Sequence, residues 1–433
     1  MSVFSLSNLK KTWYYLQKNG IRNAVWAVLE RIGQEQEVYT WQEPDEKTLS
    51  FQREHSASLR ISIVVPAYRT KKEHLEAMLN SVSRQSYPHW ELIVADAGGT
   101  AESVQAWAKK NGICLRKAAD ASNLAEWKDQ SIMLCTLSEN KGISANTNAG
   151  IELAAGDAVG LLDHDDLLTA NALWEMADCL EKEKKRGKQK LVLFSDEDKC
   201  DGAASRFYEP NFKPDFDGEL LLTNNYICHF TVIETAFLKE LKLRSGFDGA
   251  QDYDLMLRAY AAGGQFVHVP KVLYHWRCHE ASTASNPQSK RYAYEAGQRA
   301  LEDYCLRKGW KATVSGLKHL GFYREDYEDS VFCQRPEIGI WAKPLPGGRD
   351  IFGIRHPKGF LVSGLYENDG SMRYAGLRKG YSGPMHRAAL QQSAPAADLR
   401  SMEVCSALKE RYAQTIAELK EACQGLSTAA PGK

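Results

Sequence analysis

From residue 59 onward, apolar runs typical of buried strands alternate with segments of helical periodicity, and this alternation restricts the chain to an α/β fold. The strand-like runs are ISIVVPAY, ELIVADAGG, SIMLCTL, AVGLLDHDD and LVLFSDEDK, and the helical ones are KKEHLEAMLNSVSRQ, ISANTNAGIELAA and ALWEMADCLEKEKKR. Because crossovers between parallel strands are right-handed, this order predicts a Rossmann-like nucleotide-binding half. Ligands of such sheets bind outside the carboxyl ends of the strands.

After Lys199 the alternation ends in the turn-rich sequence FYEPNFKPDFDGELL. The segments that follow, HFTVIE, DYDLMLRAYAAGG, VHVPKVLYHW and RYAYEAGQRALEDYCLRKG, predict a mixed sheet with helices that closes near Ser315. We therefore expect an N-terminal helical segment over 1–58, one α/β domain over 59–315 and a C-terminal extension over 316–433. LRSMEVCSALKERYAQTIAELKEA predicts a helix within that extension.

The composition excludes some partners and favours a compartment. Basic and acidic residues number 55 each, so the chain lacks the positive field that binds nucleic acid. Ten cysteines without C-x-x-C spacing are typical of a reducing compartment, and no apolar run is long enough to span a bilayer. We expect a cytoplasmic protein. The basic, aromatic stretch LKKTWYYLQKNGIRNAVWAVLERI fits either a helix on the anionic cytoplasmic face of the inner membrane or a helix packed on the main domain.

The first two strands end in residues suited to a nucleotide. A carboxylate at the end of the second strand can accept a hydrogen bond from a pyrimidine N–H, and the adjoining glycines allow close approach of the backbone. The alternative is that Pro and Asp-x-Gly-Gly are ordinary loop residues. The residues concerned are Pro66, Ala67, Tyr68, Asp96, Gly98 and Gly99.

The segment Asp163-His164-Asp165-Asp166 directly follows the apolar run AVGLL. Carboxylates this close together repel one another unless a positive partner lies among them. Mg²⁺ or Mn²⁺, shared with the phosphates of a nucleotide, would relieve that repulsion. Helix capping by Asp165 or Asp166 is the structural alternative, but capping does not account for all three acids.

Two further motifs carry groups able to do chemistry. Asp252, in Gln251-Asp252-Tyr253-Asp254, can take a proton from a hydroxyl, or it can simply cap a helix. In Tyr274-His275-Trp276-Arg277, the imidazole can complete a cation site and the guanidinium can pair with phosphate. A histidine in an aromatic run is more often a packed, hydrogen-bonded residue.

A sugar pocket is expected opposite the nucleotide site, because aromatic faces and amides suit sugar rings. The acids of Ser195-Asp196-Glu197-Asp198 end a strand and are candidates to face it. The expected acceptor and sugar contacts are Asp196, Glu197, Glu209, Phe212, Asn224, Asn225, Tyr226, His229, Trp276 and Arg277.

Taken in order, VVPAY, LIVADAGG, ENKGISANTNAGI, GLLDHDD, GAQDYDLMLR and VLYHWR resemble the family 2 glycosyltransferases, inverting enzymes with a GT-A fold. The likeness covers residues 59–310. FSDEDK, FKPDF and YHWR are similar to bacterial enzymes that build O-antigen, rhamnose-rich or galactofuranose-containing surface polysaccharides. The tail over 353–405 faintly resembles part of a second transferase module, without an Asp-x-Asp of its own.

The resemblance implies roles at the matching positions. It places Pro66, Ala67, Tyr68 and Asp96 at the nucleotide, Asp163, His164 and Asp165 at the donor, and Asp252 as the catalytic base. Asp163 and Asp165 would hold the metal, joined by His275 as in galactofuranosyl relatives. Many relatives carry an arginine where this chain has Thr147, so Lys141 and Asn146 are the expected nucleotide contacts in that loop.

The predicted function is transfer of a sugar from a UDP-sugar or dTDP-sugar to a hydroxyl of a glycan or lipid-linked glycan, with Mn²⁺ or Mg²⁺ as cofactor. An inactive sugar-binding protein would have little reason to keep Asp163, Asp165 and Asp252 together. A sugar-nucleotide nucleotidyltransferase should carry a Gly-rich triphosphate loop where this chain has PAYRT. A structural protein with chance acid clusters is the third alternative, and the sequence leaves the oligomeric state open.

Overall fold

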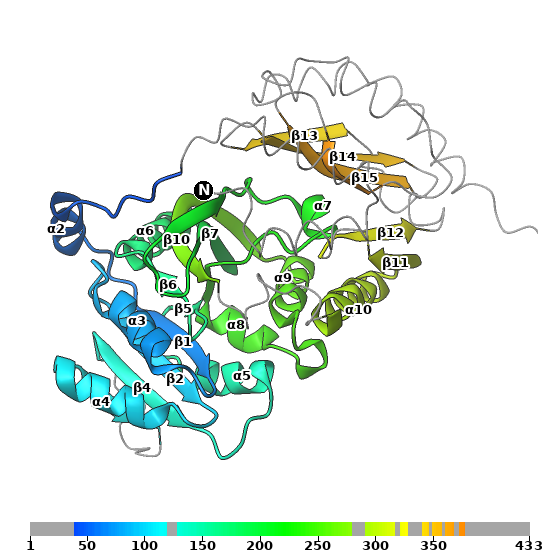
Figure 1. The fold of residues 1–433 in the computed structure, drawn as a ribbon. Helices are drawn as coiled ribbons and strands as arrows, with labels where there is room; N and C mark the ends of the chain where they lie inside the picture. Colours follow the sequence, from blue (N-terminus) through cyan, green and yellow to red (C-terminus); the bar gives the residue numbers. More distant parts are fainter. Residues whose placement is uncertain are drawn as a thin grey trace, which may run out of the picture. The chain divides into compact units, whose positions relative to one another are not determined.

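The computed structural model describes residues 39–118, 128–278, 291–316, 321–327, 340–345, 349–356, 360–367 and 372–376. The helices expected within 1–38 and 399–422 lie outside these residues. The chain divides between Trp41 and Gln42, and the fold described below belongs to the part that begins at Gln42 (Figure 1).

A ten-stranded mixed sheet forms the centre of this part, in the order β3-β4-β2-β1-β5-β9-β7-β10-β6, with β8 beside β7. Strands β3, β4, β2, β1 and β5 are mutually parallel, β9 is antiparallel to both of its neighbours, and β10 runs parallel to β7. The strands are β1 Ile61–Ala67, β2 Trp90–Asp96, β3 Cys114–Lys117, β4 Ser131–Thr136, β5 Ala158–Leu161, β6 Leu167–Leu168, β7 Leu191–Cys200, β8 Phe207–Asn211, β9 Thr231–Glu234 and β10 Gln265–Arg277.

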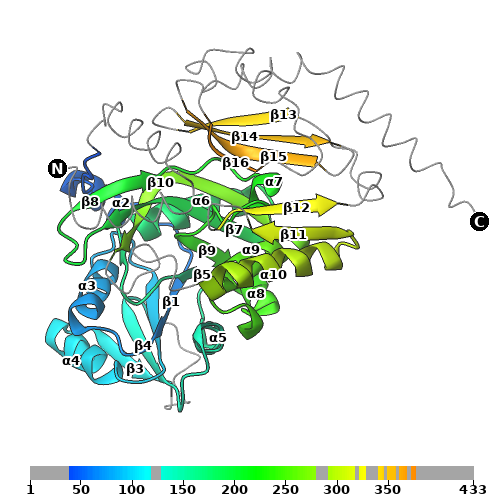
Figure 2. The same ribbon diagram turned by 45° about the vertical axis from the view of Figure 1, so that its right-hand side comes forward.

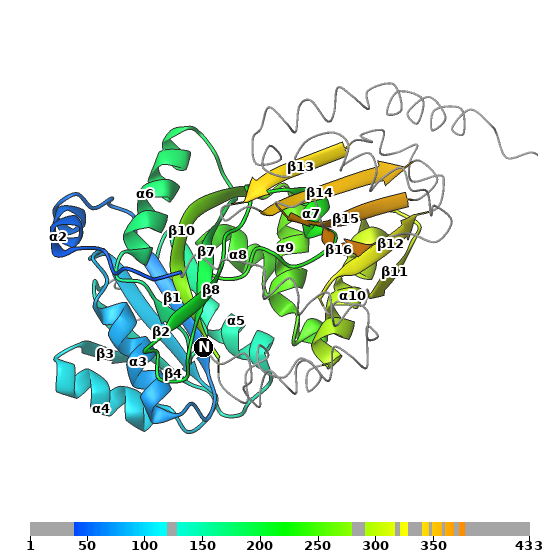
Figure 3. The ribbon, with the colours of Figure 1, turned by 45° about the horizontal axis from the view of Figure 1, so that its top comes forward.

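Helices cover both faces of the sheet (Figure 3). Helices α3, α4 and α6 pack on one face, and α5, α7, α8, α9 and α10 pack on the other. Their bounds are α3 Lys72–Ser83, α4 Ala101–Asn111, α5 Ile143–Leu153, α6 Ala172–Lys185, α7 Gly218–Leu221, α8 Thr235–Leu241, α9 Gln251–Ala261 and α10 Arg291–Arg307, with the 3₁₀ turn η2 at Ser245–Phe247.

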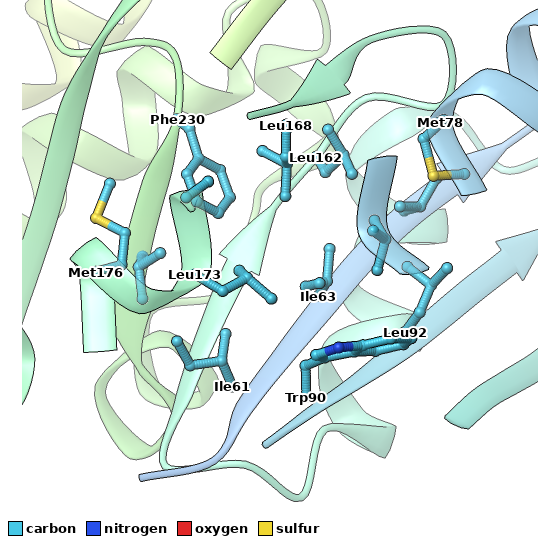
Figure 4. Close-up of a cluster of buried hydrophobic side chains, with 14 of the residues drawn as sticks. Ile61, Ile63, Met78, Trp90, Leu92, Leu162, Leu168, Leu173, Met176 and Phe230 are labelled. Atoms are coloured by element: carbon cyan, nitrogen blue, oxygen red, sulfur yellow. The ribbon is translucent and has the colours of Figure 1, made fainter. Parts of the chain in front are cut away.

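Two apolar clusters, one on each face, hold the layers together. In β1 the side chains alternate, so that Ile61 and Ile63 enter the cluster under α3 and α6 whereas Val64 enters the other. Figure 4 shows the first cluster, in which Trp90 and Met176 lie among aliphatic side chains. This burial on both faces explains why the strands read as nearly continuous apolar runs.

The predicted fold class is confirmed: the chain is α/β, with a parallel nucleotide-binding-type half joined to a mixed sheet. Every strand and helix that the sequence predicted within the described residues is present in the structure. The sequence did not predict β3, β6, β8, α4, α7 or α8, all short elements except α4. None of the described helices combines the length and apolarity that a bilayer crossing requires.

Two contacts cross the proposed domain limits, one at residues 58 and 59 and the other at residues 315 and 316. Helix α2, Glu46–Glu54, lies before residue 59 and buries Gln52, whose side chain meets Ser86 and Glu175. Beyond residue 315, β11 Ala312–Gly316 pairs with β12 Tyr323–Tyr327. The C-terminal extension also contains an antiparallel sheet, β13 Ile340–Leu345, β14 Arg349–His356, β15 Phe360–Glu367 and β16 Met372–Gly376 (Figure 2), which the sequence did not predict.

Candidate active site

The sheet topology brings the predicted site residues to one edge. Strands β1, β2, β5, β7 and β10 all end there, because each is parallel to β1 directly or through the antiparallel β9. Leu161, Thr231 and Phe194 are in register on β5, β9 and β7. Residues that follow Leu161 and Phe194 therefore lie beside those that precede Thr231.

Asp166 is fixed by the last strand of the sheet. It is 2% exposed, and its carboxylate accepts hydrogen bonds from the Tyr274 hydroxyl at 2.5 Å and the Arg277 backbone N–H at 2.7 Å. Helix α6 begins only at Ala172, after the short strand β6. The capping alternative for Asp165 and Asp166 is therefore wrong. Asp166 instead anchors the segment Asp163-His164-Asp165-Asp166, the acidic loop.

Asp163 is left in a strongly negative environment. Burial raises the pKa of Asp163, the charges of Asp165 and Asp252 raise it further, and His229 and His164 oppose them. Burial raises the pKa of Asp166 as well, and the charges of Asp165 and Asp163 raise it further. A divalent cation bound by one or two carboxylates and by ligand phosphates fits such a cluster.

The described residues contain no group of three or more His, Cys, Asp or Glu side chains placed to hold a metal by themselves. His275, the third predicted ligand, is 3% exposed and its Nδ1 lies 2.5 Å from Asp198 Oδ1. A ligating histidine commonly gives its second nitrogen to a carboxylate, so this pairing suits either a packed residue or a ligand. Metal binding by Asp163, Asp165 and His275 stays a prediction.

Asp252 and Asp254 have different surroundings although they share one turn of α9. Asp252 is half-buried; its Oδ2 accepts from Asn225 Nδ2 and Cys228 Sγ, each at 3.0 Å. Asp254 is 1% exposed and is bound by Arg244 and Arg258. Asp254 therefore ties α9 to its neighbours, and Asp252 is the acid directed toward the acidic loop, where its charge acts on Asp163.

Asp96 shapes its own loop. It is 1% exposed, and its two oxygens accept backbone hydrogen bonds from Gly98, Thr100 and Ala101, at the start of α4. Gly98 and Gly99 have φ of 135° and 86°, which other residues rarely adopt. The loop alternative accounts for this motif, and the nucleotide contact of Asp96 stays a prediction. Beside it, Ala67 is buried, Pro66 is half-buried and Tyr68 is 40% exposed.

The loop before α5 is shaped by amides and a glycine. Asn146 is 4% exposed; its Oδ1 accepts from the Lys141 backbone N–H and its Nδ2 donates to Asn140. A Cβ at Gly142 would lie 2.3 Å from an oxygen of Asp248, which reaches this loop from the turn before α9. The Lys141 ammonium is exposed beside Glu139, and Thr147 bonds within its helix. The nucleotide contacts of Lys141 and Asn146 stay predictions.

A buried lysine that the site prediction omitted organises the centre of the edge. Lys213 is 4% exposed, and its Nζ donates to the carbonyls of Ser195, Ile227 and His229 at 2.7, 3.0 and 2.6 Å. The motif FKPDF contained a signal for this role, since a lysine between Phe212 and Pro214 in a turn is unlike a solvated charge. Glu197 completes the network by accepting from the His229 backbone N–H and ring.

The Glu197–His229 pair is charged. Burial favours neutral forms, but Lys213 and His229 lower the pKa of Glu197 to about 2, and Glu197 raises that of His229 to about 9. The imidazole stacks on Tyr274 with ring centroids 5.0 Å apart. A positive charge is thus held beside the acidic loop by Glu197 of β7 and Tyr274 of β10.

The pH dependence of stability should report this pair. Because the pKa of folded His229 is about 9 and its ordinary value is 6.5, the stabilisation is complete below pH 6.5 and is lost as pH rises toward 9. We expect the difference in unfolding free energy between wild type and His229→Gln to shrink over that window. Chemical denaturation from pH 6 to pH 9.5 measures it; a constant difference would contradict the pairing.

The remaining predicted sugar contacts divide into two groups. Asp196 is 3% exposed and accepts from His268 and from the Lys213 backbone N–H, and Arg277 donates to the carbonyls of Asp165 and Gly202. These two side chains hold the edge together. Trp276 and Asn224 are half-buried, Glu209 pairs with Lys199, and Tyr226 is buried with its hydroxyl accepting from the Asp217 N–H. Phe212 is half-buried. Sugar contacts at all these positions stay predictions.

Residues 62–241 match the model of the family described as glycosyl transferase family 2. The protein y4gI of Sinorhizobium fredii is 36% identical over 255 residues, 58% of this chain and 26% of that protein. The O-antigen biosynthesis protein RfbC of Myxococcus xanthus is 34% identical over 256 residues, 59% of this chain and 19% of its own length. The chain thus spans about a quarter or less of these relatives. A solved structure of Staphylococcus aureus TarS in complex with UDP-GlcNAc is 19% identical, covers 57% of this chain and 67% of that one, and has a TM-score of 0.42.

Proposed function

The chain contains a family 2 glycosyltransferase domain in residues 62–241, and from this premise we propose that the protein is an inverting glycosyltransferase. It would transfer a sugar from a nucleotide diphosphate sugar to a hydroxyl of a glycan or lipid-linked glycan, in the synthesis of a bacterial surface polysaccharide. The O-antigen biosynthesis name of a relative supports the acceptor class.

One observation carries the proposal: the sheet edge brings together Asp163, in the loop after β5, and Asp252, whose carboxylate is held by the segment that precedes β9, although the two residues belong to different motifs. One acid is needed near the leaving diphosphate and one near the attacking hydroxyl, and the sheet edge supplies both. A binding protein would gain nothing from concentrating like charges at this point, since their mutual repulsion destabilises the fold.

The proposed reaction is a single displacement at the anomeric carbon. Asp252 takes the proton of the acceptor hydroxyl as its oxygen bonds to that carbon, while the bond to the diphosphate breaks on the opposite face. Asp163 and Asp165 hold the donor end of the site. When bound there, Mn²⁺ or Mg²⁺ would neutralise charge on the leaving diphosphate. His229, held protonated by Glu197, supplies a further positive charge.

We propose a uridine or thymidine nucleotide as donor, in keeping with the place of Asp96 at the carboxyl end of β2. The reaction is proposed for the cytoplasm. Contact with the membrane face would depend on residues 1–38, and the oligomeric state is left open.

Thermal-shift binding tests the donor site. UDP, dTDP, GDP and CMP are each added with and without Mn²⁺ to wild type and to Asp165→Ala. We expect one nucleotide to raise the melting temperature only with the cation, and we expect the rise to vanish in Asp165→Ala. A nucleotide that binds the folded protein stabilises it against unfolding, and a variant that cannot bind gains no such stabilisation. Asp178→Ala, which removes a partly exposed acid on α6, is the matched control. No rise with any nucleotide in wild type would contradict the proposed function.

A further inference from the structure

The carboxylate of Asp252 is held by a segment that lies between α7 and β9. Asn225 donates from Nδ2 and Cys228 from Sγ, both to Oδ2, and both atoms lie 3.0 Å from it. The same amide nitrogen lies 3.4 Å from the sulfur, so the three side chains form one closed group. Oδ1 accepts from the Tyr253 N–H at 2.8 Å and keeps capacity for one more donor.

We infer that Asn225 and Cys228 are positioning residues for Asp252, and that they hold Oδ2 so that Oδ1 receives the acceptor proton. This inference rests on the proposed function. Asn225 is also a predicted sugar contact; its Nδ2 is engaged with Asp252, so a sugar hydroxyl would be accepted by its Oδ1. The thiol acts here as a hydrogen-bond donor to the base.

The segment that carries both donors is itself fixed. Lys213 binds the carbonyls of Ile227 and His229, on either side of Cys228. Asn224 pairs with Phe322 in an isolated bridge. These contacts hold the positions of the amide and thiol relative to α9, which gives the two hydrogen bonds a defined geometry.

The thiol stays protonated at neutral pH. Burial raises the pKa of Cys228 well above its ordinary value, and the charge of Asp252 raises it further. A protonated thiol donates its hydrogen, whereas a thiolate would repel the carboxylate.

The kinetic experiment compares Cys228→Ala, Cys228→Ser, Asn225→Ala and Asn225→Asp. We expect Cys228→Ala to lower kcat about tenfold with the KM for donor unchanged, because a base displaced by a fraction of an ångström transfers protons poorly. Serine, which keeps a donor, should restore most of kcat.

Asn225→Ala should resemble Cys228→Ala, whereas Asn225→Asp should lower kcat further, because it sets a like charge against Oδ2. Cys114→Ala, on the edge strand β3, is the matched cysteine control and should change neither kcat nor KM. Circular dichroism and melting temperature confirm that each variant is folded. Unchanged kcat in folded Cys228→Ala and Asn225→Ala would overturn the inference.

A second measurement does not depend on activity. Iodoacetamide labelling of Cys228, followed by mass spectrometry from pH 7 to pH 10, reports its thiolate fraction in wild type and Asp252→Asn, with Cys114 as internal reference. We expect labelling of Cys228 to begin at lower pH in the variant, because the neighbouring negative charge is gone. Identical curves would overturn the contact. Absence of transfer by wild type with every donor would count against the proposed function alone, and labelling would still decide the contact.

Discussion

Replacing Asp252 with asparagine is expected to reduce sugar transfer by about 10²- to 10⁴-fold while leaving nucleotide binding intact, because the amide cannot accept the proton of the acceptor hydroxyl. The substitution keeps the size of the side chain. It also keeps an oxygen that can accept from Asn225 and Cys228, so the fold of the α9 turn should survive. Initial rates with a sugar donor measure the loss of transfer, and thermal-shift binding measures the retained affinity for the nucleotide.

Asp254→Asn is the matched control, since it makes the same change two residues further along α9. Its carboxylate is 1% exposed and pairs with Arg244 and Arg258. The expected result is a loss of about 3 kcal/mol in the free energy of unfolding, with turnover per folded molecule nearly unchanged. Near-normal transfer by Asp252→Asn would mean that another residue takes the proton.

Replacing Lys213 with methionine is expected to cost about 3–5 kcal/mol of folding free energy. Methionine fills much of the volume but leaves the carbonyls of Ser195, Ile227 and His229 without their buried donor. It also removes the cation that helps to keep Glu197 ionised. Urea unfolding followed by circular dichroism measures the loss.

Lys182→Met is the control for this substitution. Its ammonium pairs with Asp178 on the surface of α6, where the lysine side chain is 63% exposed. An exposed pair contributes about 0–1 kcal/mol, so this variant should unfold almost as wild type does. A loss below about 1 kcal/mol in Lys213→Met would show that the network is not what holds the edge together.

Asp252 and Asp254 illustrate how far sequence reasoning reaches. The motif Gln-Asp-Tyr-Asp and the family resemblance predicted Asp252 as the proton acceptor, but they gave no role to Asp254. The difference between the two acids comes from Arg244 and Asn225, which approach the turn from different elements. Cys228 was missed altogether, because a single cysteine carries no signal until its neighbour is known.

The acidic loop shows the same limit. Its place after an apolar strand was correctly predicted. The expected capping role failed because β6 separates the loop from α6, and a two-residue strand leaves no periodicity to detect. The partners of Asp166 are Tyr274 and Arg277, the latter 111 positions away in the chain.

The order of apolar runs by itself determined the α/β class and the edge of the sheet at which the acids gather. It could do so because buried parallel strands must be apolar on both faces and must end on the same side. Only the tertiary structure decided which acids are bound and which face the site. Hydrogen-bond partners such as Lys213 and the His229 carbonyl come from separate elements, and their distances depend on how those elements pack.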